Sequence, residues 1–409
     1  MRDKFYMMGV CGMGMAPLAA FLKDGGADVE GYDDHPDGCI KSALEKCGVR
    51  FAPPYRFGGD RKVVISSALK LRRPEISAAT GCFEIFRRGE CWAEVCASRK
   101  LTAVVGSHGK STVSALISHA AMKTEDCGHL VGAIPVGFPM HRYCADKKII
   151  ISEIDESDGT IENFSPEVTV ALNADLDHID TYADNLRLRE MFERLFARTK
   201  KTVLYPESDA MLSEIAAKSK THSRAVRTSG GFMSVNIAMA LAALEETFGR
   251  PFSESALEGY RGLLRRQEII FDSRGVRAVA DYAHHPNEVR SFLDWFSKKF
   301  EGEKIIAFQP HRYTRTRRFS KEFADVLGAR LGEAQVLLLP VYPASEPFDP
   351  LGESSAITAH CAGIKLANCG DFFKMVSEKL KASKSPLNIA IVGAGDFYFD
   401  AKEFFQKLK

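Results

Sequence analysis

Short apolar runs alternate with amphipathic stretches along most of the chain, and a glycine-containing or charged turn separates each run from the stretch that follows it. Residues 5–8 form the first apolar run. Met15, Leu18, Ala19 and Leu22 then recur with the spacing of one helical face. This order of strand, turn and helix begins each of three blocks, which is typical of parallel α/β construction.

The same pattern predicts the elements of the later blocks. A second amphipathic helix is predicted over 113–120, and a third begins at Pro286, because proline suits the first helical position. We expect domain boundaries close to the polar stretch 97–100 and to Arg265, which gives domains at 1–98, 99–263 and 264–409. Further strands are predicted at 63–67, 101–105, 148–151, 168–172, 276–280, 304–308, 336–339 and 387–392.

The composition is that of an ordinary globular protein. The chain has 409 residues, of which 45% are hydrophobic and 26% are charged, and this argues against a disordered or coiled-coil protein. Lys+Arg at 55 against Asp+Glu at 53 leaves a net charge of +2, which provides no overall attraction for nucleic acid or an anionic membrane. No stretch approaches the roughly 18 apolar residues of a membrane span. We therefore expect neither partner, and no protein partner is evident.

Ten cysteines are scattered without a C-x-x-C pair, which argues against zinc-knuckle and thioredoxin-type motifs. Reduced thiols in a cytoplasmic protein are the simplest interpretation. Arg2 and Lys4 precede the uncharged run 6–22, which superficially resembles a secretory signal. The glycines at 9, 12 and 14 interrupt that run and suit a strand-to-helix turn. We therefore expect a folded element there and a cytoplasmic location.

The sharpest motif is Gly106-Ser107-His108-Gly109-Lys110-Ser111-Thr112, which lies between a predicted strand and an amphipathic helix. Backbone N–H groups at a helix N-terminus bind polyphosphate, the lysine adds a cation, and the serine hydroxyl suits Mg²⁺. The usual Walker spacing requires glycine where Val104 stands, so the motif is a shortened G-x-x-G-K-S-T form. The alternative is an ordinary glycine turn followed by a solvated lysine.

Acidic side chains follow the next two predicted strands, at Glu153 to Asp158 and at Asp175 to His178. The carboxyl ends of parallel strands share one edge of the sheet, so both groups are expected beside the phosphate loop. Several carboxylates with one imidazole suit one or two hard cations bridging ATP. Helix capping is the alternative role for any one of them.

Histidines and arginines mark the same edge of the third block. His284 and His285 follow one strand, and we expect one to cap the next helix and the other to face the site. Arg312 and Arg315 follow another strand and form a candidate clamp for an anionic substrate. The neighbouring arginines at 317 and 318 are expected on the surface. If all four arginines are considered together, the alternative is a patch that binds nucleic acid.

The N-terminal turn Gly9-Val10-Cys11-Gly12-Met13-Gly14 departs from G-x-G-x-x-G at Cys11, although Asp33 follows at about the expected spacing of ~20 residues. Taken alone, this turn suits either a dinucleotide or the diphosphate of a different nucleotide.

As a set, these motifs resemble the Mur ligases, the ATP-dependent amide-forming enzymes of peptidoglycan precursor assembly. The resemblance covers nearly the whole chain and is strongest to the branch that attaches L-alanine to UDP-N-acetylmuramate. It rests on motifs in family order: the N-terminal glycine turn, residues 64–70, Arg87-Arg88, the shortened phosphate loop, residues 153–158, Asp177-His178, residues 282–286, residues 308–316 and residues 393–396.

The resemblance implies an α/β fold of three domains: a Rossmann-like N-terminal domain for the UDP-sugar, a central P-loop ATPase-type domain with a mostly parallel sheet, and a Rossmann-like C-terminal domain for the amino acid. It implies ATP and Mg²⁺ as cofactors, an acyl-phosphate intermediate, and closure of the domains around the ligands. Mg²⁺ and Lys110 are expected to stabilise the transferred phosphoryl group.

The resemblance also implies roles for individual residues. The catalytic set is Lys110, His284, His285, His311, Arg312 and Arg315, with the arginines on the amino-acid carboxylate and His284 or His285 as base. The UDP-sugar set is Gly9, Cys11, Gly12, Met13, Gly14, Asp33, Ser66, Ser67, Arg87 and Arg88. The ATP set is Gly106, Ser107, His108, Gly109, Lys110, Ser111, Thr112, Asn236, Arg265 and Asp281, and the metal set is Ser111, Glu153 and His178.

The chain departs from the family at positions expected to seat the nucleotide. The family's G-x-H-N-x-x-N segment is Gly230-Gly231-Phe232-Met233-Ser234-Val235-Asn236 here, so its histidine and first asparagine are replaced. Ala280 replaces the first aspartate of an Asp-Asp-Tyr motif, and the stretch 205–228 is shorter. Three alternatives stay open: a ligase for another amino acid or a peptide, a family member that binds the UDP-sugar or nucleotide without joining substrates, and a dinucleotide oxidoreductase.

Overall fold

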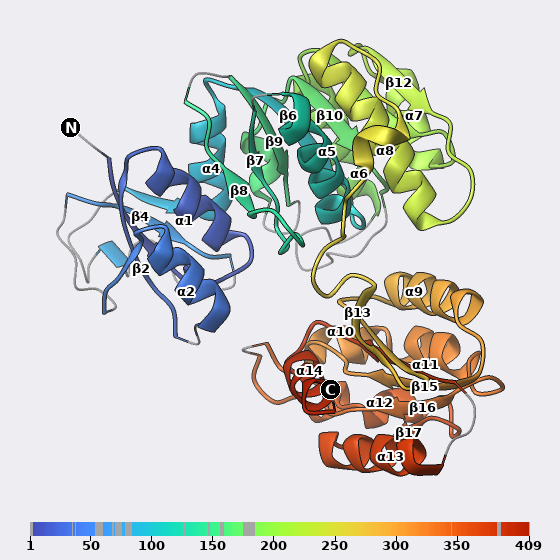
Figure 1. Ribbon diagram of the computed structural model, residues 1–409. Coiled ribbons are helices and arrows are strands. Elements are labelled where there is room, and N and C mark those ends of the chain that lie inside the picture. The colour runs from blue at the N-terminus through green and yellow to red at the C-terminus, as the bar shows by residue number, and fades with distance from the viewer. Residues whose placement is uncertain are drawn as a thin grey trace. The chain divides into compact units, whose positions relative to one another are not determined.

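The structure is a computed structural model. It describes residues 3–34, 36, 38–53, 60–67, 69, 76–77, 84–125, 127–145, 148–155, 159–174, 185–344, 346–382 and 386–408. The chain forms two compact units, Met1–Arg261 and Gly262–Lys409 (Figure 1).

The first unit begins with a five-stranded parallel sheet in the order β3-β2-β1-β4-β5. The chain winds outward from β1 and then crosses back to β4, so the direction of winding reverses between these two strands. Ligands of open α/β sheets bind at the carboxyl ends of strands at such a point. The strands are β1 (Lys4–Met8), β2 (Asp28–Tyr32), β3 (Arg50–Phe51), β4 (Lys62–Ile65) and β5 (Ile85–Arg87).

Helix α1 (Met15–Asp24) packs on this sheet through the apolar face that the sequence predicts. Met15, Leu18, Ala19 and Leu22 are all buried, in one cluster with strand residues such as Met7. The run that resembles a secretory signal is therefore built into β1, the glycine turn and α1. The other helices of this part are α2 (Gly38–Lys46) and α4 (Arg88–Cys96).

The second sheet of this unit has seven strands in the order β12-β11-β10-β6-β9-β7-β8. All of its pairs are parallel except β7 with β8. The direction of winding reverses between β6 and β10, so the turn after β6 lies at the switch point. The strands are β6 (Lys100–Val105), β7 (Gly128–Leu130), β8 (His141–Arg142), β9 (Ile149–Glu153), β10 (Val168–Ala171), β11 (Thr202–Pro206) and β12 (Ser223–Val226).

Helices cover both faces of the second sheet. One face carries α5 (Lys110–Thr124) and α8 (Phe232–Phe248), which share a cluster with strand residues such as Val104. The other carries α6 (Asn185–Arg198) and α7 (Ala210–Lys218), whose cluster continues without a break into α1, α4 and the first sheet. This shared core explains why two sheets form one compact unit. Two short 3₁₀ helices, η1 (Thr160–Asn163) and η2 (Glu254–Leu257), complete this unit.

The second unit is built on a six-stranded sheet in the order β13-β14-β18-β15-β16-β17. Only β13 is antiparallel to its neighbour, and the sequence analysis missed this hairpin. The other pairs are parallel. The strands are β13 (Glu268–Ser273), β14 (Val276–Asp281), β15 (Glu303–Phe308), β16 (Gln335–Leu338), β17 (Lys365–Leu366) and β18 (Leu387–Val392).

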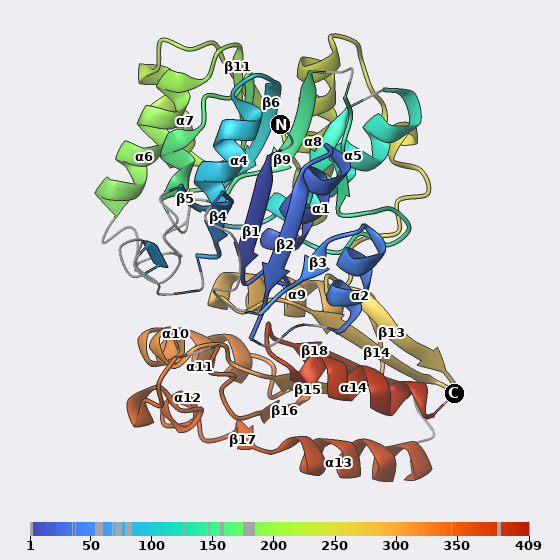
Figure 2. The same ribbon diagram turned by 90° about the vertical axis from the view of Figure 1, so that its left-hand side faces the viewer.

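Helices again form two layers around this sheet (Figure 2). One apolar cluster joins α9, α11 and α12 to the sheet, and a second joins α13 and α14 to the opposite face. As predicted, Pro286 is the first residue of α9. The helices are α9 (Pro286–Lys299), α10 (Tyr313–Arg318), α11 (Ser320–Gly328), η3 (Pro350–Gly352), α12 (Ser355–Thr358), α13 (Cys369–Ala382) and α14 (Phe397–Gln406).

The predicted fold class, α/β with mostly parallel sheets in three groups, is confirmed. Several strand ends differ by one or two residues, and β9 reaches Glu153, so this carboxylate stands on the strand and not in the turn after it. The domain boundaries at 98/99 and 263/264 stay predictions.

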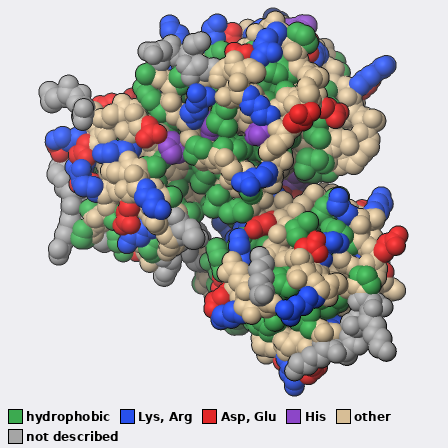
Figure 3. Space-filling view, viewed as in Figure 1, with side chains coloured by type: hydrophobic (Ala, Val, Ile, Leu, Met, Phe, Trp, Pro, Cys, Tyr) green, Lys and Arg blue, Asp and Glu red, His purple; other side chains and the backbone are tan. Residues whose placement is uncertain are grey.

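The distribution of surface charges and the state of the cysteines agree with the composition. Acidic and basic side chains intermingle over the face shown in Figure 3, as the net charge of +2 leads one to expect. Of the described helices, none has both the length and the apolar character that a membrane span requires. Every cysteine whose side chain is described is a free thiol.

Candidate active site

The turn after β1 is held in shape by backbone hydrogen bonds and by one carboxylate. Gly9 has a φ of +75°, and its N–H donates to the Tyr32 carbonyl at 2.8 Å. The Cys11 N–H donates to Asp33 Oδ2 at 2.9 Å. A Cβ on Gly9 would lie 2.8 Å from Ser66 Cβ, so the ends of β1 and β4 approach closely there. The predicted UDP-sugar residues of these two strands therefore share one sheet edge.

Arg88 joins this turn to the second sheet. A Cβ on Gly14 would lie 2.9 Å from Arg88 Cδ, and Arg88 Nη2 lies 3.6 Å from Asp155 Oδ2. Arg87, also predicted for the UDP-sugar, is exposed and is the N-cap residue of α4. The structure therefore brings Arg88 into the neighbourhood of the glycine turn and leaves Arg87 at the surface.

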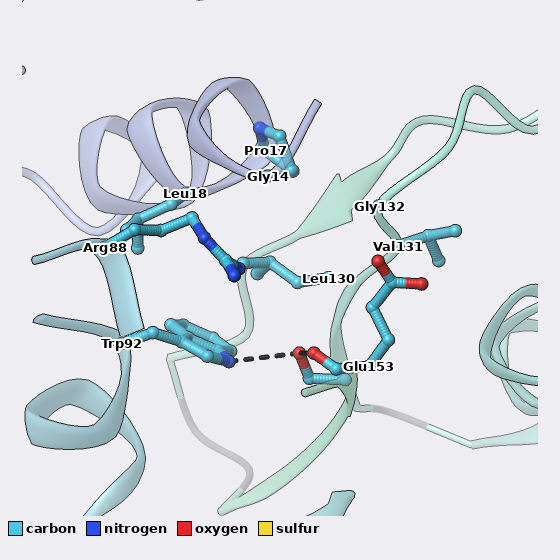
Figure 4. A pocket seen from close by; sticks show the side chains of 10 residues that line it. Gly14, Pro17, Leu18, Arg88, Trp92, Leu130, Val131, Gly132 and Glu153 are labelled. Atoms are coloured by element: carbon cyan, nitrogen blue, oxygen red, sulfur yellow. Dashed lines mark hydrogen bonds between the residues drawn. The ribbon is translucent and has the colours of Figure 1, made fainter. Parts of the chain in front are cut away.

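A small pocket lies between the glycine turn and the end of β9. Figure 4 shows Arg88, Trp92 and Glu153 converging on it. Trp92 Nε1 donates to Ser152 Oγ at 3.0 Å, and the Ser152 hydroxyl donates to the carbonyl of Glu153 at 2.9 Å. Helix α4 is thereby tied to the strand that carries Glu153, a link that the sequence analysis did not predict.

The phosphate loop has the predicted position between β6 and α5. Gly106 and Gly109 adopt φ values of +125° and +86°, which favour glycine. Lys110 Nζ donates to the Gly106 carbonyl at 2.7 Å. This bond curls the lysine side chain back over its own loop, which is the region that would hold polyphosphate.

Asn173 is a residue of this site that the sequence analysis missed. Its Oδ1 accepts the His108 N–H and its Nδ2 donates to the His108 carbonyl, each at 2.9 Å. A Cβ on Gly106 would lie 2.9 Å from the Asn173 carbonyl oxygen. Its position directly after the predicted strand 168–172 could have indicated it. The sequence analysis instead assigned the metal site to the carboxylates that follow.

The start of α8 borders the same loop. Asn236 is 2% exposed, and a Cβ on Gly109 would lie 2.9 Å from Asn236 Oδ1. Phe232 lies on the same side, 3.4 Å from that Cβ position. Asn236 therefore lies beside the loop, together with one of the two residues that depart from the family, and its contact with ATP stays a prediction.

Glu153 is a partly buried carboxylate of the site. Burial raises its pKa, while a hydrogen bond from Ser111 and the charge of Lys110 lower it. A Cβ on Gly132 would lie 1.7 Å from Glu153 Oε1, so a side chain at this position would displace the Glu153 carboxylate. Glu153 Oε2 has no hydrogen-bond partner among the described residues. An unpartnered carboxylate oxygen beside a hydroxyl fits a hard cation such as Mg²⁺, whose preferred ligands are oxygens.

The rest of the predicted metal set cannot be placed. His178 lies outside the described residues, as do Glu156 to Asp158, Asp175 and Asp177. Within the described ranges, no three His, Cys, Asp or Glu side chains gather closely enough to hold a metal ion.

In the second unit, one of the two neighbouring histidines caps the next helix, as predicted. His285 is the N-cap of α9, where its Nδ1 accepts the Asn287 N–H at 3.4 Å, and its ring packs on Phe319 with centroids 4.8 Å apart. The His284 ring lies 5.8 Å from the His311 ring, and its Nδ1 lies 2.9 Å from the Tyr282 carbonyl oxygen. His284 therefore lies beside His311, and its role as a base stays a prediction.

His311 stacks on Tyr342, with ring centroids 5.6 Å apart and planes at 25°. Burial lowers its pKa to about 2, and His284 and Arg315 contribute in the same direction. The imidazole is therefore neutral at physiological pH. Arg315 Nη1 lies 3.4 Å from His311 Nδ1, so this arginine and the two histidines form one cluster.

Arg312 has an unusual backbone conformation for a residue with a side chain, with a φ of +72°. Its N–H donates to the Tyr342 carbonyl at 2.8 Å, and its buried Nε has no partner among the described residues. Such strain is concentrated at functional sites in many proteins. In contrast, residues 317 and 318 are exposed, as predicted.

Two residues predicted to bind ATP are engaged within the second unit. Arg265 Nη2 donates to the carbonyls of Gly393 and Gly395 at 3.0 and 2.7 Å, and its guanidinium lies 4.7 Å from the Tyr282 ring. The oxygens of Asp281 accept the N–H groups of residues 267 and 283, each at 2.9 Å. Burial raises the pKa of Asp281 to about 6. Both residues have a structural role here, and their contact with ATP stays a prediction.

Two family models match the first unit. Residues 4–96 match the model described as "Mur ligase family, catalytic domain", and residues 104–249 match "Mur ligase middle domain". A curated UDP-N-acetylmuramate--L-alanine ligase of Paenarthrobacter aurescens is 28% identical, covering 96% of this chain and 94% of that protein.

Solved structures share the fold over both units. The UDP-N-acetylmuramate-alanine ligase MurC of Thermotoga maritima superposes with a TM-score of 0.77 at 22% identity, covering 99% of each chain. MurF ligase of the same organism, solved in complex with ADP, has a TM-score of 0.60 at 17% identity, covering 92% of this chain and 94% of that one. Since the two models together account for most of the first unit and the full-length relatives extend the match across the second, this protein belongs to the Mur ligase family.

Proposed function

We propose that this enzyme uses ATP and Mg²⁺ to join L-alanine to UDP-N-acetylmuramate in peptidoglycan precursor synthesis. The observation that carries the proposal is the shared sheet edge of the first unit, where β6 ends in the phosphate loop and its neighbour β9 ends in Glu153. The full-length similarity to a curated ligase of this specificity supports the choice of substrates. The free thiols of the described cysteines support a cytoplasmic location.

In the first step, an oxygen of the muramoyl carboxylate attacks the γ-phosphorus of ATP, and the bond to the bridging oxygen breaks to release ADP. The loop N–H groups and Lys110 hold the phosphates and stabilise the charge that develops on them. Ser111 and Glu153, with His178, would hold Mg²⁺, which when bound neutralises phosphate charge.

In the second step, the neutral amine of L-alanine attacks the carbonyl carbon of the acyl phosphate. A tetrahedral intermediate forms and collapses as the carbon–oxygen bond to phosphate breaks. Arg312 and Arg315 receive the amino-acid carboxylate. The Nε of Arg312, which has no partner among the described residues, supports this role. We assign the amine proton to His284. His311 lies beside it, and its lowered pKa keeps its imidazole neutral and makes it a weak proton acceptor.

The test is phosphate release from MgATP with UDP-N-acetylmuramate, comparing L-alanine, glycine, L-serine, a peptide and no amine, with the product identified by mass. We expect release that depends on both the sugar and L-alanine. Preference for another amine would correct the substrate. No release with any amine, from protein that still binds the UDP-sugar, would favour a family member that does not join its substrates.

Replacing the phosphate-loop lysine tests the site directly. Lys110→Ala is expected to lower kcat by about 100-fold or more, because one fixed donor to a developing charge contributes that much. Lys100→Ala, at the exposed opposite end of the same strand, is the matched control and is expected to keep wild-type turnover. Substantial activity in Lys110→Ala would contradict the assignment of the loop.

A further inference from the structure

Helix α9 begins with a carboxylate that meets both neighbouring histidines. Glu288 stands in the first turn of this helix, and its side chain is only 10% exposed. Its Oε2 accepts the main-chain N–H of His284 at 3.0 Å and that of His285 at 3.4 Å. The same oxygen lies 3.4 Å from Nδ1 of the His284 ring. Glu288 therefore contacts the imidazole of His284 in addition to capping the helix.

The Tyr282 carbonyl determines which nitrogen of the His284 ring carries the hydrogen. Nδ1 of His284 lies 2.9 Å from this carbonyl oxygen. A carbonyl oxygen can only accept a hydrogen bond, so Nδ1 must be the donor. In the neutral ring the lone pair is then on Nε2, because one nitrogen of a neutral imidazole donates and the other accepts. This hydrogen bond therefore prepares Nε2 of His284 to accept a proton.

The neighbouring His311 ring has the opposite arrangement. Arg315 Nη1 lies 3.4 Å from His311 Nδ1, and since a guanidinium can only donate, this Nδ1 must be the acceptor. The lone pair of His311 is thus directed at a cation. Burial lowers the pKa of His311 to about 2, and His284 and Arg315 contribute in the same direction. Of these two imidazoles, whose centroids lie 5.8 Å apart, His284 is therefore the one prepared to accept a proton.

Glu288 provides the negative charge that a protonated His284 requires. An anion close to an imidazole favours its cationic form, and this carboxylate lies beside Nδ1. Arg266 Nη1 lies 3.7 Å from Glu288 Oε1 and balances the carboxylate while His284 is neutral. The other ionisable groups around the two imidazoles are Asp281, Tyr282, Arg265, Arg312 and Arg315.

We propose that Glu288 is a positioning residue of the ligation step: with the Tyr282 carbonyl, it holds His284 in the form that takes the proton of the attacking amine. The inference rests on the proposed ligase function and adds a residue to it. As the carbon–nitrogen bond forms, the amine nitrogen becomes positively charged and passes one proton to Nε2 of His284. The electron pair of the breaking carbon–oxygen bond leaves with phosphate. The ring is then a cation, which the Glu288 carboxylate stabilises until the proton passes to solvent.

Nuclear magnetic resonance of ¹⁵N-histidine-labelled protein tests this arrangement without turnover. The chain has 11 histidines, and the signals of His284 are those lost in His284→Gln. We expect the Nδ1–H form for His284 and the Nε2–H form for His311. In Glu288→Gln, the His284 ring should keep its form, and the midpoint of its protonation should fall by about one pH unit or more. An Nε2–H form of His284, or an unchanged midpoint, would overturn the inference.

The same variant tests the residue in turnover. Glutamine at the third helical position also accepts N–H groups, so Glu288→Gln keeps the cap and removes the charge. We expect kcat to fall by about 10- to 100-fold, which is part of the roughly 10²- to 10⁴-fold that a positioned base contributes, with unchanged KM for ATP. The acid limb of the pH profile of kcat should move to lower pH. A wild-type kcat and pH profile in Glu288→Gln would overturn the inference.

The resonance titration also separates His284 from a second group that titrates nearby. Burial raises the pKa of Asp281 to about 6, and the charge of Glu288 adds to this rise. Loss of the Glu288 charge would therefore move the titration of Asp281 in the same direction as that of His284. A shifted acid limb supports the inference when the His284 midpoint shifts with it, and contradicts the inference when that midpoint stays in place.

Asp371→Asn is the matched control. Asp371 Oδ2 accepts the Asn368 N–H at 3.1 Å, and the Asp371 N–H donates to Asn368 Oδ1 at 2.9 Å, which is a reciprocal cap at the start of α13 in the same unit. This replacement also removes a carboxylate from a helix cap, and we expect it to leave kcat and its pH profile unchanged. Equal losses in Asp371→Asn and Glu288→Gln would overturn the inference.

Failure of the proposed function gives a different result. Wild-type protein that releases no phosphate with any amine would contradict the ligase. In such protein, the Nδ1–H form of His284 and its lower midpoint in Glu288→Gln would still support the arrangement of these two residues. An active wild-type enzyme with an unaffected Glu288→Gln variant would confirm the ligase and overturn the inference.

Discussion

Around the phosphate loop, two hydrogen bonds from the amide of Asn173 fix the backbone of His108 on both its N–H and its carbonyl. A loop that binds phosphate through backbone N–H groups depends on the direction of those groups. Asn173 is therefore a positioning residue: it acts on the nucleotide through the loop.

Asn173→Ala is expected to weaken ADP binding by about 10- to 100-fold, because two hydrogen bonds that hold the loop are lost at about 1 kcal/mol or more each. Titration calorimetry measures the Kd, and circular dichroism checks the fold. Asn388→Ala is the matched control, since Asn388 Nδ2 donates to the Glu301 carbonyl at 2.8 Å in the second unit. Asn388→Ala should leave the Kd for ADP unchanged, and an equal effect of both variants would argue against a local role for Asn173.

Among the elements, helix α4 packs closely against η1. A Cβ on Gly89 would lie 1.8 Å from Thr160 Oγ1 at the start of η1. The same helix carries Arg88 and Trp92, which reach Asp155 and Ser152. The position of α4 therefore affects the strand that ends in Glu153.

Gly89→Ala is expected to destabilise the first unit by roughly 1–3 kcal/mol, which is the usual effect of an added methyl in a packed contact. Gly38→Ala is the matched control, because Gly38 also stands at the start of a helix and no atom of a described residue lies within 4 Å of its Cβ position. Urea denaturation measures both. Equal stability of the two variants would show that α4 shifts away from η1 without cost.

For the whole molecule, the distribution of apolar clusters predicts how the protein unfolds. One cluster runs through both sheets of the first unit, from Phe5 to Ala216. The clusters of the second unit contain residues of that unit alone. The three sheets should therefore melt as two cooperative bodies, because sheets that share a core lose it together.

Scanning calorimetry should resolve two transitions, and a core truncation should move one of them. Phe196→Ala on α6 and Phe405→Ala on α14 each remove a fully buried ring, at a cost of about 3–5 kcal/mol. We expect Phe196→Ala to lower only the transition of the first unit and Phe405→Ala only that of the second. A single transition that both variants lower equally would contradict this division.

The features that depend on local periodicity and backbone chemistry could be predicted from the sequence. The spacing of Met15, Leu18, Ala19 and Leu22 predicts α1, and Pro286 predicts the start of α9, because helix formation depends on neighbours three or four residues apart. The phosphate loop was predictable for the same reason, since its glycines and Lys110 are contiguous. Parallel sheets followed from the repeated order of strand and helix.

Tertiary structure decided the features that depend on residues far apart in the chain. Which of His284 and His285 caps α9, and which lies beside His311, could be determined only from the folded structure. Asn173 lies 65 residues from His108, so no local pattern links them. The shared core of the first two sheets and the closeness of Phe232 to Gly109 also arise only on folding. In each case the deciding contact joins distant segments, and its identity depends on packing that no local pattern in the sequence records.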